Sequence, residues 1–333
     1  MNKTRISFAD IIPFAVFIVI FLFFEIASGG KMLSPFNLST ILEQSLITIV
    51  VGCGVLFVVA QGSIDLSVGV NLALSGVVAT WAANAAGGVL LVPVALLVAL
   101  IVGIVNGVIV SKFKVPSFMV TIAMLIGIRG IVNYIQTIIG TQYIPESMTV
   151  LREPYIRYPA FVLLVIVMFY LFEFTKIGQY SKAIGENEST AEFIGIPVPR
   201  MKIIAFALSG LMVGFGTLFS LTSVGGTSQM MGVFFEIKVA MAIFLGGVLV
   251  TGGTSTKLYK VLLGSFSITI IVNGLALIGL SETQYSQSVE GILLLLILYV
   301  TIIANKRKNR VRALPDELEK TDLKPDQIIT SGS

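Results

Sequence analysis

The chain has 333 residues, of which 56% are hydrophobic and only 12% are charged, with a net charge of +4 and a mean hydropathy of +0.96. A soluble domain carries about 25% charged residues, so this chain has too little polar surface for a water-soluble globule, and lipid is the solvent that tolerates it. It has no histidine and one cysteine, Cys53, which excludes intrachain disulfides and removes the commonest general base and transition-metal ligand.

Apolar runs of helical length recur along the chain, each close to the roughly 20 residues that a helix needs to cross the hydrocarbon layer. A polar break separates the second run from the third, and the eighth is short for a span. We predict an all-α polytopic membrane protein with about ten transmembrane helices, at 8–28, 44–61, 66–86, 89–111, 117–140, 158–175, 202–224, 236–250, 258–280 and 288–304.

Lysine and arginine are distributed unevenly between alternate connecting segments. With ten spans, most fall on the side of the two termini, whereas the opposite side holds only Lys31, Arg152, Arg157 and Lys238. Cytoplasmic loops carry an excess of Lys and Arg, so both termini are predicted to be cytoplasmic. The membrane domain is expected over 1–305, followed by a polar cytoplasmic tail at 306–333 whose first basic residues anchor the last helix at lipid headgroups rather than bind nucleic acid.

Two features concern how the spans pack. Gly103 with Gly107, and Gly210 with Gly214, are small-xxx-small pairs that let helices approach closely. The run Ile104-Val105-Asn106-Gly107 recurs as Ile271-Val272-Asn273-Gly274 in a span of opposite direction. This recurrence is typical of an inverted repeat, although Ile131-Val132-Asn133 also occurs and a chance recurrence stays open.

The break at 61–69 reads Gln61-Gly62-Ser63-Ile64-Asp65-Leu66-Ser67-Val68-Gly69. Gly62 and Gly69 loosen a helix, and Asp65 is costly in lipid unless it lies at a helix end, in a polar cavity or beside a partner. One interpretation is a short cytoplasmic turn in which Asp65 caps the next helix. The other is a broken helix that lines a transport path.

The segment 176–202 is the longest loop on the predicted cytoplasmic side. Ser189 followed by Glu192 is a capping-box pattern, and Gly195 and Pro197 stop a helix. The sequence therefore predicts a helix of about two turns that either presents Phe193 and Ile194 to a groove on a soluble partner or packs on the underside of the bundle.

Other glycines and charges have expected structural roles. The paired glycines Gly246-Gly247 and Gly252-Gly253 permit sharp turns or close backbone approach. Arg129 lies deepest in its span and needs a carboxylate or carbonyl partner, for which Asp65 and Glu43 are candidates.

The sequence lacks the motifs of the commonest enzymatic sites. There is no Gly-x-x-x-x-Gly-Lys-Ser/Thr motif, no Cys/His cluster for a metal, and no histidine for a Ser/His/Asp set. The chain is therefore not expected to hydrolyse ATP or to perform metal chemistry by itself.

Several segments, in this order, carry a resemblance: the 62–69 run; Pro116-Ser117-Phe118-Met119-Val120-Thr121-Ile122 with Arg129-Gly130; Ala183-Ile184-Gly185 with Asn187, Ala191 and Gly195-Ile196; Leu208-Ser209-Gly210; the paired glycines; and Asn273-Gly274-Leu275. Over roughly 10–305 the chain resembles the permease subunits of bacterial ABC importers of the ribose/xylose (simple sugar) type, in the branched-chain amino-acid/ribose permease superfamily. It departs from that pattern at Ser63, at Lys238 and at Val248-Leu249-Val250, which leaves the substrate open and suggests one half of a heterodimer.

The resemblance implies a multi-pass protein of the bacterial inner membrane that translocates a sugar delivered by an extracytoplasmic binding protein. A second permease chain, identical or different, would pair with it, and an ABC ATPase subunit with two nucleotide-binding domains would hold the ATP and Mg²⁺, so this chain needs no cofactor. Contact with that ATPase is expected at Glu186, Asn187, Ser189, Ala191, Glu192, Phe193, Ile194 and Gly195. Candidates for the translocation path are Ser63, Asp65, Ser67, Asn71, Asn106 and Asn273.

Other functions remain open on the sequence. Within the same class, the substrate could be a nucleoside, an autoinducer or a branched-chain amino acid. In a different class, an ion-coupled secondary carrier would use Asp65 or Glu236 to bind the proton or cation.

Overall fold

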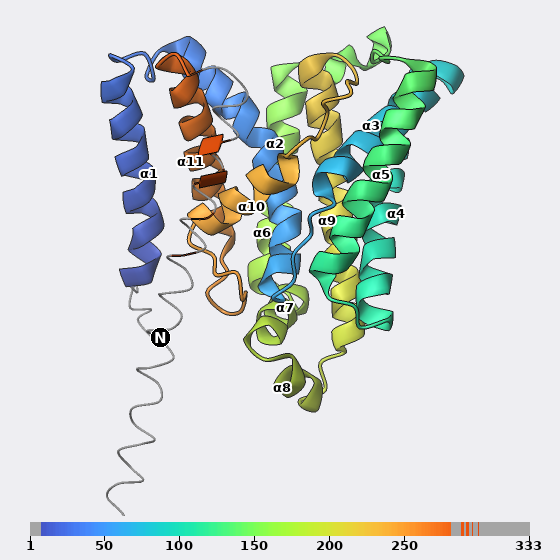
Figure 1. Cartoon of the computed structure of the whole chain (residues 1–333), viewed down its shortest axis with the longest axis vertical. Coiled ribbons are helices and arrows are strands. Elements are labelled where there is room, and N and C mark those ends of the chain that lie inside the picture. Colours follow the sequence, from blue (N-terminus) through green and yellow to red (C-terminus); the bar gives the residue numbers. More distant parts are fainter. Residues whose placement is uncertain (1–7, 281–287, 290, 293–294, 296–298, 300–333) are drawn as a thin grey trace, which may run out of the picture.

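The computed structural model describes residues 8–280 and, beyond them, 288–289, 291–292, 295 and 299. In this part the chain forms a bundle of helices whose connecting segments gather at two ends (Figure 1). The α-helices are α1 (Phe8–Ala27), α2 (Pro35–Ala60), α3 (Val68–Ala86), α4 (Leu91–Lys112), α5 (Ser117–Ile139), α6 (Pro154–Phe174), α7 (Lys176–Glu186), α8 (Glu188–Phe193), α9 (Val198–Val224), α10 (Phe235–Leu245) and α11 (Leu258–Leu277). Two 3₁₀ segments, η1 (Gly88–Leu90) and η2 (Glu146–Arg152), lie between them.

Among the described residues, seven helices are long and apolar enough to cross a membrane: α2, α3, α4 with η1, α5, α6, α9 and α11. Helix α1 adds a shorter apolar stretch, Pro13–Ala27. The span expected at 236–250 is only the 11-residue α10, which at 1.5 Å per residue is about 16 Å long and cannot cross the bilayer alone. Most of the span expected at 288–304, and all of the tail at 306–333, lie outside the described residues.

Helix α2 begins earlier than the apolar run predicted. Ser34 is its N-cap and accepts a hydrogen bond from the backbone N–H of Asn37 (3.3 Å), while Pro35 occupies the first helical position. The polar side chains of its first turns, such as Glu43, hide this start from a hydropathy window. The remainder of α2 is apolar on all sides and lies in the centre of the bundle, with Ile49 to Ala60 buried.

Helix α9 packs against both α2 and α4, and most extensively against α4. A Cβ atom on Gly103 would collide with the carbonyl oxygen of Phe206, and one on Gly210 would lie 3.1 Å from the Cα of Gly103. Gly107 and Gly214 face α9 and α4 in the same way. The small-xxx-small pairs of the sequence are therefore confirmed as the α4–α9 interface.

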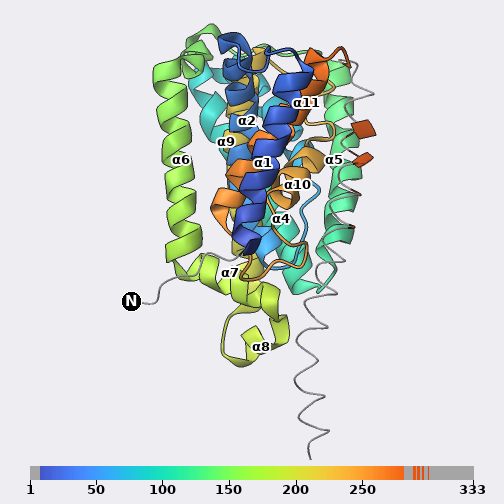
Figure 2. The same cartoon turned by 90° about the vertical axis from the view of Figure 1, so that its left-hand side faces the viewer.

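Two breaks in helical structure lie at mid-height within the bundle, one before α3 and one after α10. The extended segment 61–67 rises from the lower end of α2 to the start of α3 at about half the height of the bundle, as Figures 1 and 2 both show. Helix α10 also lies at mid-height and ends where Gly247 adopts φ +82°. The amine of buried Lys260 donates hydrogen bonds to the carbonyls of Gly247 (3.1 Å) and Ser255 (2.9 Å). These two carbonyls follow the end of α10 and lack helical partners, and Lys260 satisfies them.

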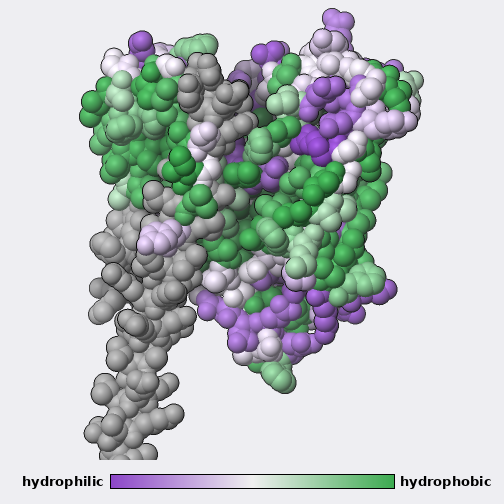
Figure 3. All heavy atoms as spheres, viewed as in Figure 1, coloured by the Kyte–Doolittle hydropathy of each residue, from purple (hydrophilic) through white to green (hydrophobic). Residues whose placement is uncertain are grey.

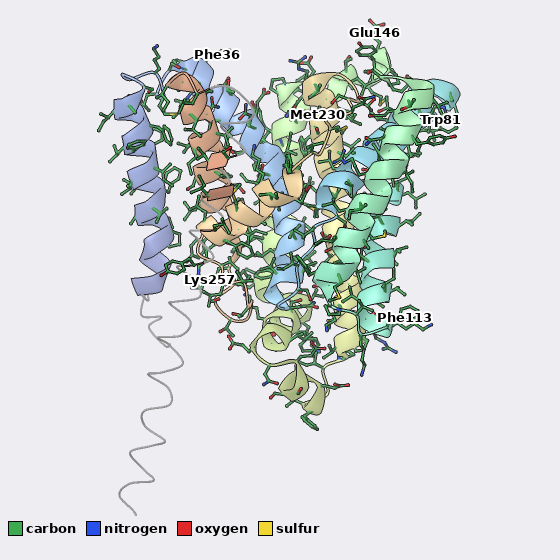
Figure 4. All side chains as sticks on the ribbon, in the orientation of Figure 1. Phe36, Trp81, Phe113, Glu146, Met230 and Lys257 are labelled. Carbon is green, nitrogen blue, oxygen red and sulfur yellow. The ribbon has the colours of Figure 1, made fainter. Side chains whose placement is uncertain are left out.

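Short helices α7 and α8 project from the end of the bundle at which α1 begins, which we call the α8 end (Figure 1). On the face shown in Figure 3, apolar residues dominate the height of the bundle and a hydrophilic surface lies below them, over α7 and α8. Phe36, Trp81 and Glu146 lie at the opposite end, and Phe113 lies near the α8 end (Figure 4). Helices α4 and α11, which carry the recurring Ile-Val-Asn-Gly sequence, run in opposite directions as expected.

Candidate coupling and translocation sites

Helix α8 forms the tip of the α8 end and presents an apolar pair to its surroundings. The side chains of Phe193 and Ile194 are 90% and 71% exposed. Ala191 is buried against Ile184, Ile196 and Val198, so a small apolar cluster anchors the buried side of the helix. The arrangement therefore leaves two large apolar side chains without internal packing, on a helix that is itself anchored.

The N-cap of α8 is Asn187, and not the Ser189 that the capping-box pattern indicated. The Asn187 side chain accepts a hydrogen bond from the backbone N–H of Thr190 (2.8 Å). Asn187 also satisfies the N-cap preference, and its earlier position adds a first turn that contains Ser189. The predicted stop is confirmed, because Gly195 follows the helix with φ +87°.

The acidic side chains of this region divide between two contacts. Glu188 forms an ion pair with Lys202 at 2.7 Å on the surface, and Glu192 stays exposed. Glu186, the last residue of α7, accepts hydrogen bonds from the backbone N–H and the hydroxyl of Thr254 at 2.9 and 2.5 Å. Glu186 thus links α7 to the loop after α10.

Helix α7 sits directly on the ends of other helices. A Cβ atom on Gly185 would collide with the carbonyl oxygen of Ala60 in α2, and one on Gly253 would lie 2.7 Å from the Glu186 carboxylate. In the middle of α7, Lys182 forms an ion pair with Glu173 of α6 at 2.6 Å. Paired glycines at 252–253 therefore serve the close backbone approach that the sequence indicated, as Gly246 does against the carbonyl oxygen of Lys260.

Three of the predicted path residues come together in one buried cluster. One Asp65 carboxylate oxygen accepts hydrogen bonds from the backbone N–H (3.0 Å) and hydroxyl (2.7 Å) of Ser67, and the other accepts from the hydroxyl of Ser209 (2.9 Å). The Asn106 amide donates to the Ser67 hydroxyl at 2.7 Å. All four side chains are less than 10% exposed. The carboxylate therefore joins the 61–67 segment to α9 and, through Ser67, to α4.

The Asp65 geometry contains elements of both sequence interpretations. Its bond to the Ser67 N–H resembles a cap, because Ser67 directly precedes α3. However, the segment is enclosed by the bundle rather than placed in an outer turn, and Gly62 adopts φ +70° where it leaves α2. A break in mid-bundle is thus present, and the polar side chains satisfy the backbone that the missing helix would have paired.

The remaining candidates lie apart from this cluster. The Asn71 amide donates to the carbonyl of Ala99 (3.1 Å) between α3 and α4. Asn273 is half-buried on α11, a helix that packs against α1, α2 and α10. Ser63 instead lines a pocket of about 510 Å³ at the α8 end.

The partner of Arg129 differs from the one that the sequence indicated. Its guanidinium donates to the carbonyl of Met231 at 3.0 Å, and the acid whose charge acts on it is Glu236 rather than Asp65 or Glu43. A Cβ atom on Gly69 would collide with the Glu236 carboxylate, so Gly69 gives this buried acid its space at the start of α10. Sequence reasoning missed this arrangement because the residues come from three separate helices and a loop.

Comparison with known proteins adds an independent line of argument. Residues 37–298 match the family model described as the branched-chain amino acid transport system / permease component. The ribose import permease protein RbsC of Escherichia coli (strain K12) is 28% identical over 287 residues, which cover 82% of this chain and 86% of the relative. The L-arabinose ABC transporter permease protein AraH of Azospirillum brasilense is 32% identical over 309 residues, or 88% of each chain.

The xylose transport system permease protein XylH of Haemophilus influenzae is 28% identical over 358 residues, covering 87% of this chain and 95% of the relative. No solved structure gave a significant match. The family model covers well over half of the chain, and the bundle of apolar helices agrees with it. The chain is thus a multi-pass membrane protein that belongs to the family of branched-chain amino acid transport system permease components.

Proposed function

We propose that this chain is the permease subunit of an ATP-driven importer in a bacterial inner membrane, and that it translocates a monosaccharide delivered by an extracytoplasmic binding protein. The observation that carries the proposal is α8, a capped helix that holds Phe193 and Ile194 in water at one end of a membrane bundle. Because large apolar side chains on a short anchored helix fit a groove on a partner, α8 is the contact for an ATPase subunit. The names of the relatives, which refer to ribose, arabinose and xylose, support a sugar as the solute.

In this mechanism the chain supplies a path and a lever, and ATP with Mg²⁺ is bound by the partner ATPase. A second permease chain pairs with this one, and closure of two nucleotide-binding domains displaces α8 in each. The path side chains are polar and mostly uncharged, as neutral polyols require: Ser63, Asp65, Ser67, Asn71, Asn106 and Asn273. Hydroxyl and amide groups exchange hydrogen bonds with sugar hydroxyls without the cost of burying an extra charge.

Reconstituted transport tests the proposal directly. Proteoliposomes would contain this chain with its co-purified ATPase and binding protein, and uptake of radiolabelled ribose, xylose, arabinose and fructose would be measured with and without ATP. We expect at least one of the four sugars to accumulate only with ATP, and dissipation of ion gradients by ionophores to leave that uptake intact. Uptake that ionophores abolish, with no dependence on ATP, would instead identify the ion-coupled carrier.

Orientation is tested at Glu188, which is exposed beside α8. A Glu188→Cys variant in intact cells should resist a membrane-impermeant thiol reagent and react once the cells are opened, since the α8 end faces the cytoplasm. Cys53 is fully buried and provides a silent background. Labelling in intact cells would reverse the orientation and remove the ATPase contact with it.

A further inference from the structure

Besides the bond between Asp65 and Ser209, the segment 61–67 is held by different parts of the bundle at Gln61 and at Ile64. At its start, the amide of buried Gln61 donates hydrogen bonds to the hydroxyl of Ser181 in α7 and to the carbonyl of Met201 in α9, each at 3.0 Å. Three residues later, the backbone N–H of Ile64 donates to the hydroxyl of Ser117 in α5, also at 3.0 Å. The segment therefore connects α7 and α9, the helices on either side of α8, to α5.

Gln61 is the point at which the elements next to α8 meet. Helix α7 precedes α8 in the chain and α9 follows it, and the Gln61 side chain bonds to both. Gly185 of α7 also lies directly against the last carbonyl of α2. A displacement of α8 that carries α7 and the start of α9 would therefore pull directly on the Gln61 side chain through these two hydrogen bonds.

A pocket of about 510 Å³ gives this displacement room. One wall is the segment from Gln61 to Ile64, a second is the turn between α4 and α5, and the third is α8 with the start of α9. The walls that bear Glu192 and Ser117 both line this space. Gly62, at φ +70°, directly follows Gln61 and has a wider choice of backbone angles than other residues.

We propose that Gln61 is a positioning residue for transport, which transmits the movement of α8 to the Asp65 segment by holding α7 and α9 to the start of that segment. This inference rests on the proposed function, since it requires an ATPase that moves α8. When α8 moves with α7 and the first turn of α9, the Gln61 end of the segment follows it. Ile64 stays on Ser117 of α5 and Asp65 stays on Ser209 further along α9, so the change concentrates at Gly62 and Ser63. The pocket next to Ser63 changes its size in the same step.

The test uses the purified complex of the full chain with its ATPase, and a Ser63→Cys variant as the probe. The labelling rate of this cysteine by a small thiosulfonate reagent is measured with and without ATP and Mg²⁺, and the parent chain with buried Cys53 gives the background. We expect ATP to change the rate at least about fivefold, the lower range of coupling between two sites. In a Gln61→Met background, which keeps the side-chain length but removes both donations, the ratio should fall to about one while the ATPase still co-purifies.

Gln142 provides the matched control, because its amide donates to the carbonyl of Ile139 at the opposite end of the bundle. Gln142→Met should leave the response of the probe unchanged. If Gln61→Met does not fold, Ser181→Ala removes one of the two bonds and should weaken the response. A full response of the probe in Gln61→Met or in Ser181→Ala would overturn the role of Gln61.

The outcomes also separate this inference from the proposed function. If sugar uptake depends on ATP but the labelling of Ser63→Cys does not respond to it, the transmission through Gln61 is wrong and the importer function stands. If uptake does not depend on ATP at all, the proposed function fails and the inference fails with it.

Discussion

Replacement of both Phe193 and Ile194 by Asp tests the contact with the ATPase. The two side chains are 90% and 71% exposed, so their loss removes almost no packing from the free chain, and surface changes of this kind usually alter stability by about 0.5 kcal/mol or less. On docking, burial of a Phe or Ile side chain is worth about 1.5–3 kcal/mol, or roughly 3–6 kcal/mol for both. The double variant should therefore bind the ATPase at least about 100-fold more weakly.

The assay is a titration of purified ATPase against the chain in lipid nanodiscs, with the dissociation constant as the readout. A Phe193→Leu/Ile194→Val variant keeps the apolar surface and serves as the matched control, which should bind within a few-fold of the parent. Thermal unfolding of the free chain shows whether the fold is intact. An undiminished affinity for the Asp variant would refute the docking role of α8 and the argument from exposure.

Three further changes test the interior. Gly103→Ala places a methyl group against the carbonyl of Phe206 and should lower stability by about 1–3 kcal/mol in thermal unfolding, whereas Gly127→Ala on α5 meets nothing within 4 Å and should not. Lys260→Met removes the donor to two carbonyls and should cost about 1–3 kcal/mol in the same assay. Asp65→Asn preserves the shape of the buried cluster but not its charge, so sugar uptake should fall more than the yield of assembled complex; normal uptake would reduce Asp65 to a helix cap.

Composition and periodicity were sufficient to predict the kind of fold and the position of α8. A membrane requires long apolar helices, so their presence can be read from hydropathy alone. The exposed pair Phe193 and Ile194 was predictable because local stop signals at Gly195 and Pro197 confine a short helix to a polar loop. The predicted N-cap was wrong: Asn187 and Ser189 both suit that position, and the structure places Asn187 there.

The interior of the site depends on distances that a sequence does not encode locally. A hydropathy window joins the apolar residues on both sides of Gly246 and Gly247, and so predicts a full span where α10 stops. The hydrogen-bond partners of Arg129 and Gln61 lie 102 to 140 positions away along the chain. Ser209 belonged to a recognisable Leu-Ser-Gly sequence, but only the fold shows that its hydroxyl serves Asp65.

Burial of Ser63, Asp65 and Ser67 relieves these residues of a requirement that lipid-facing side chains must meet. Side chains on the outside of the bundle lie in hydrocarbon, and polar substitutions there would hinder insertion of the helix into the membrane. Ser63, Asp65 and Ser67 touch protein instead. If this stretch lines the translocation path as proposed, substitutions within it could change the solute without altering the hydropathy of any membrane span.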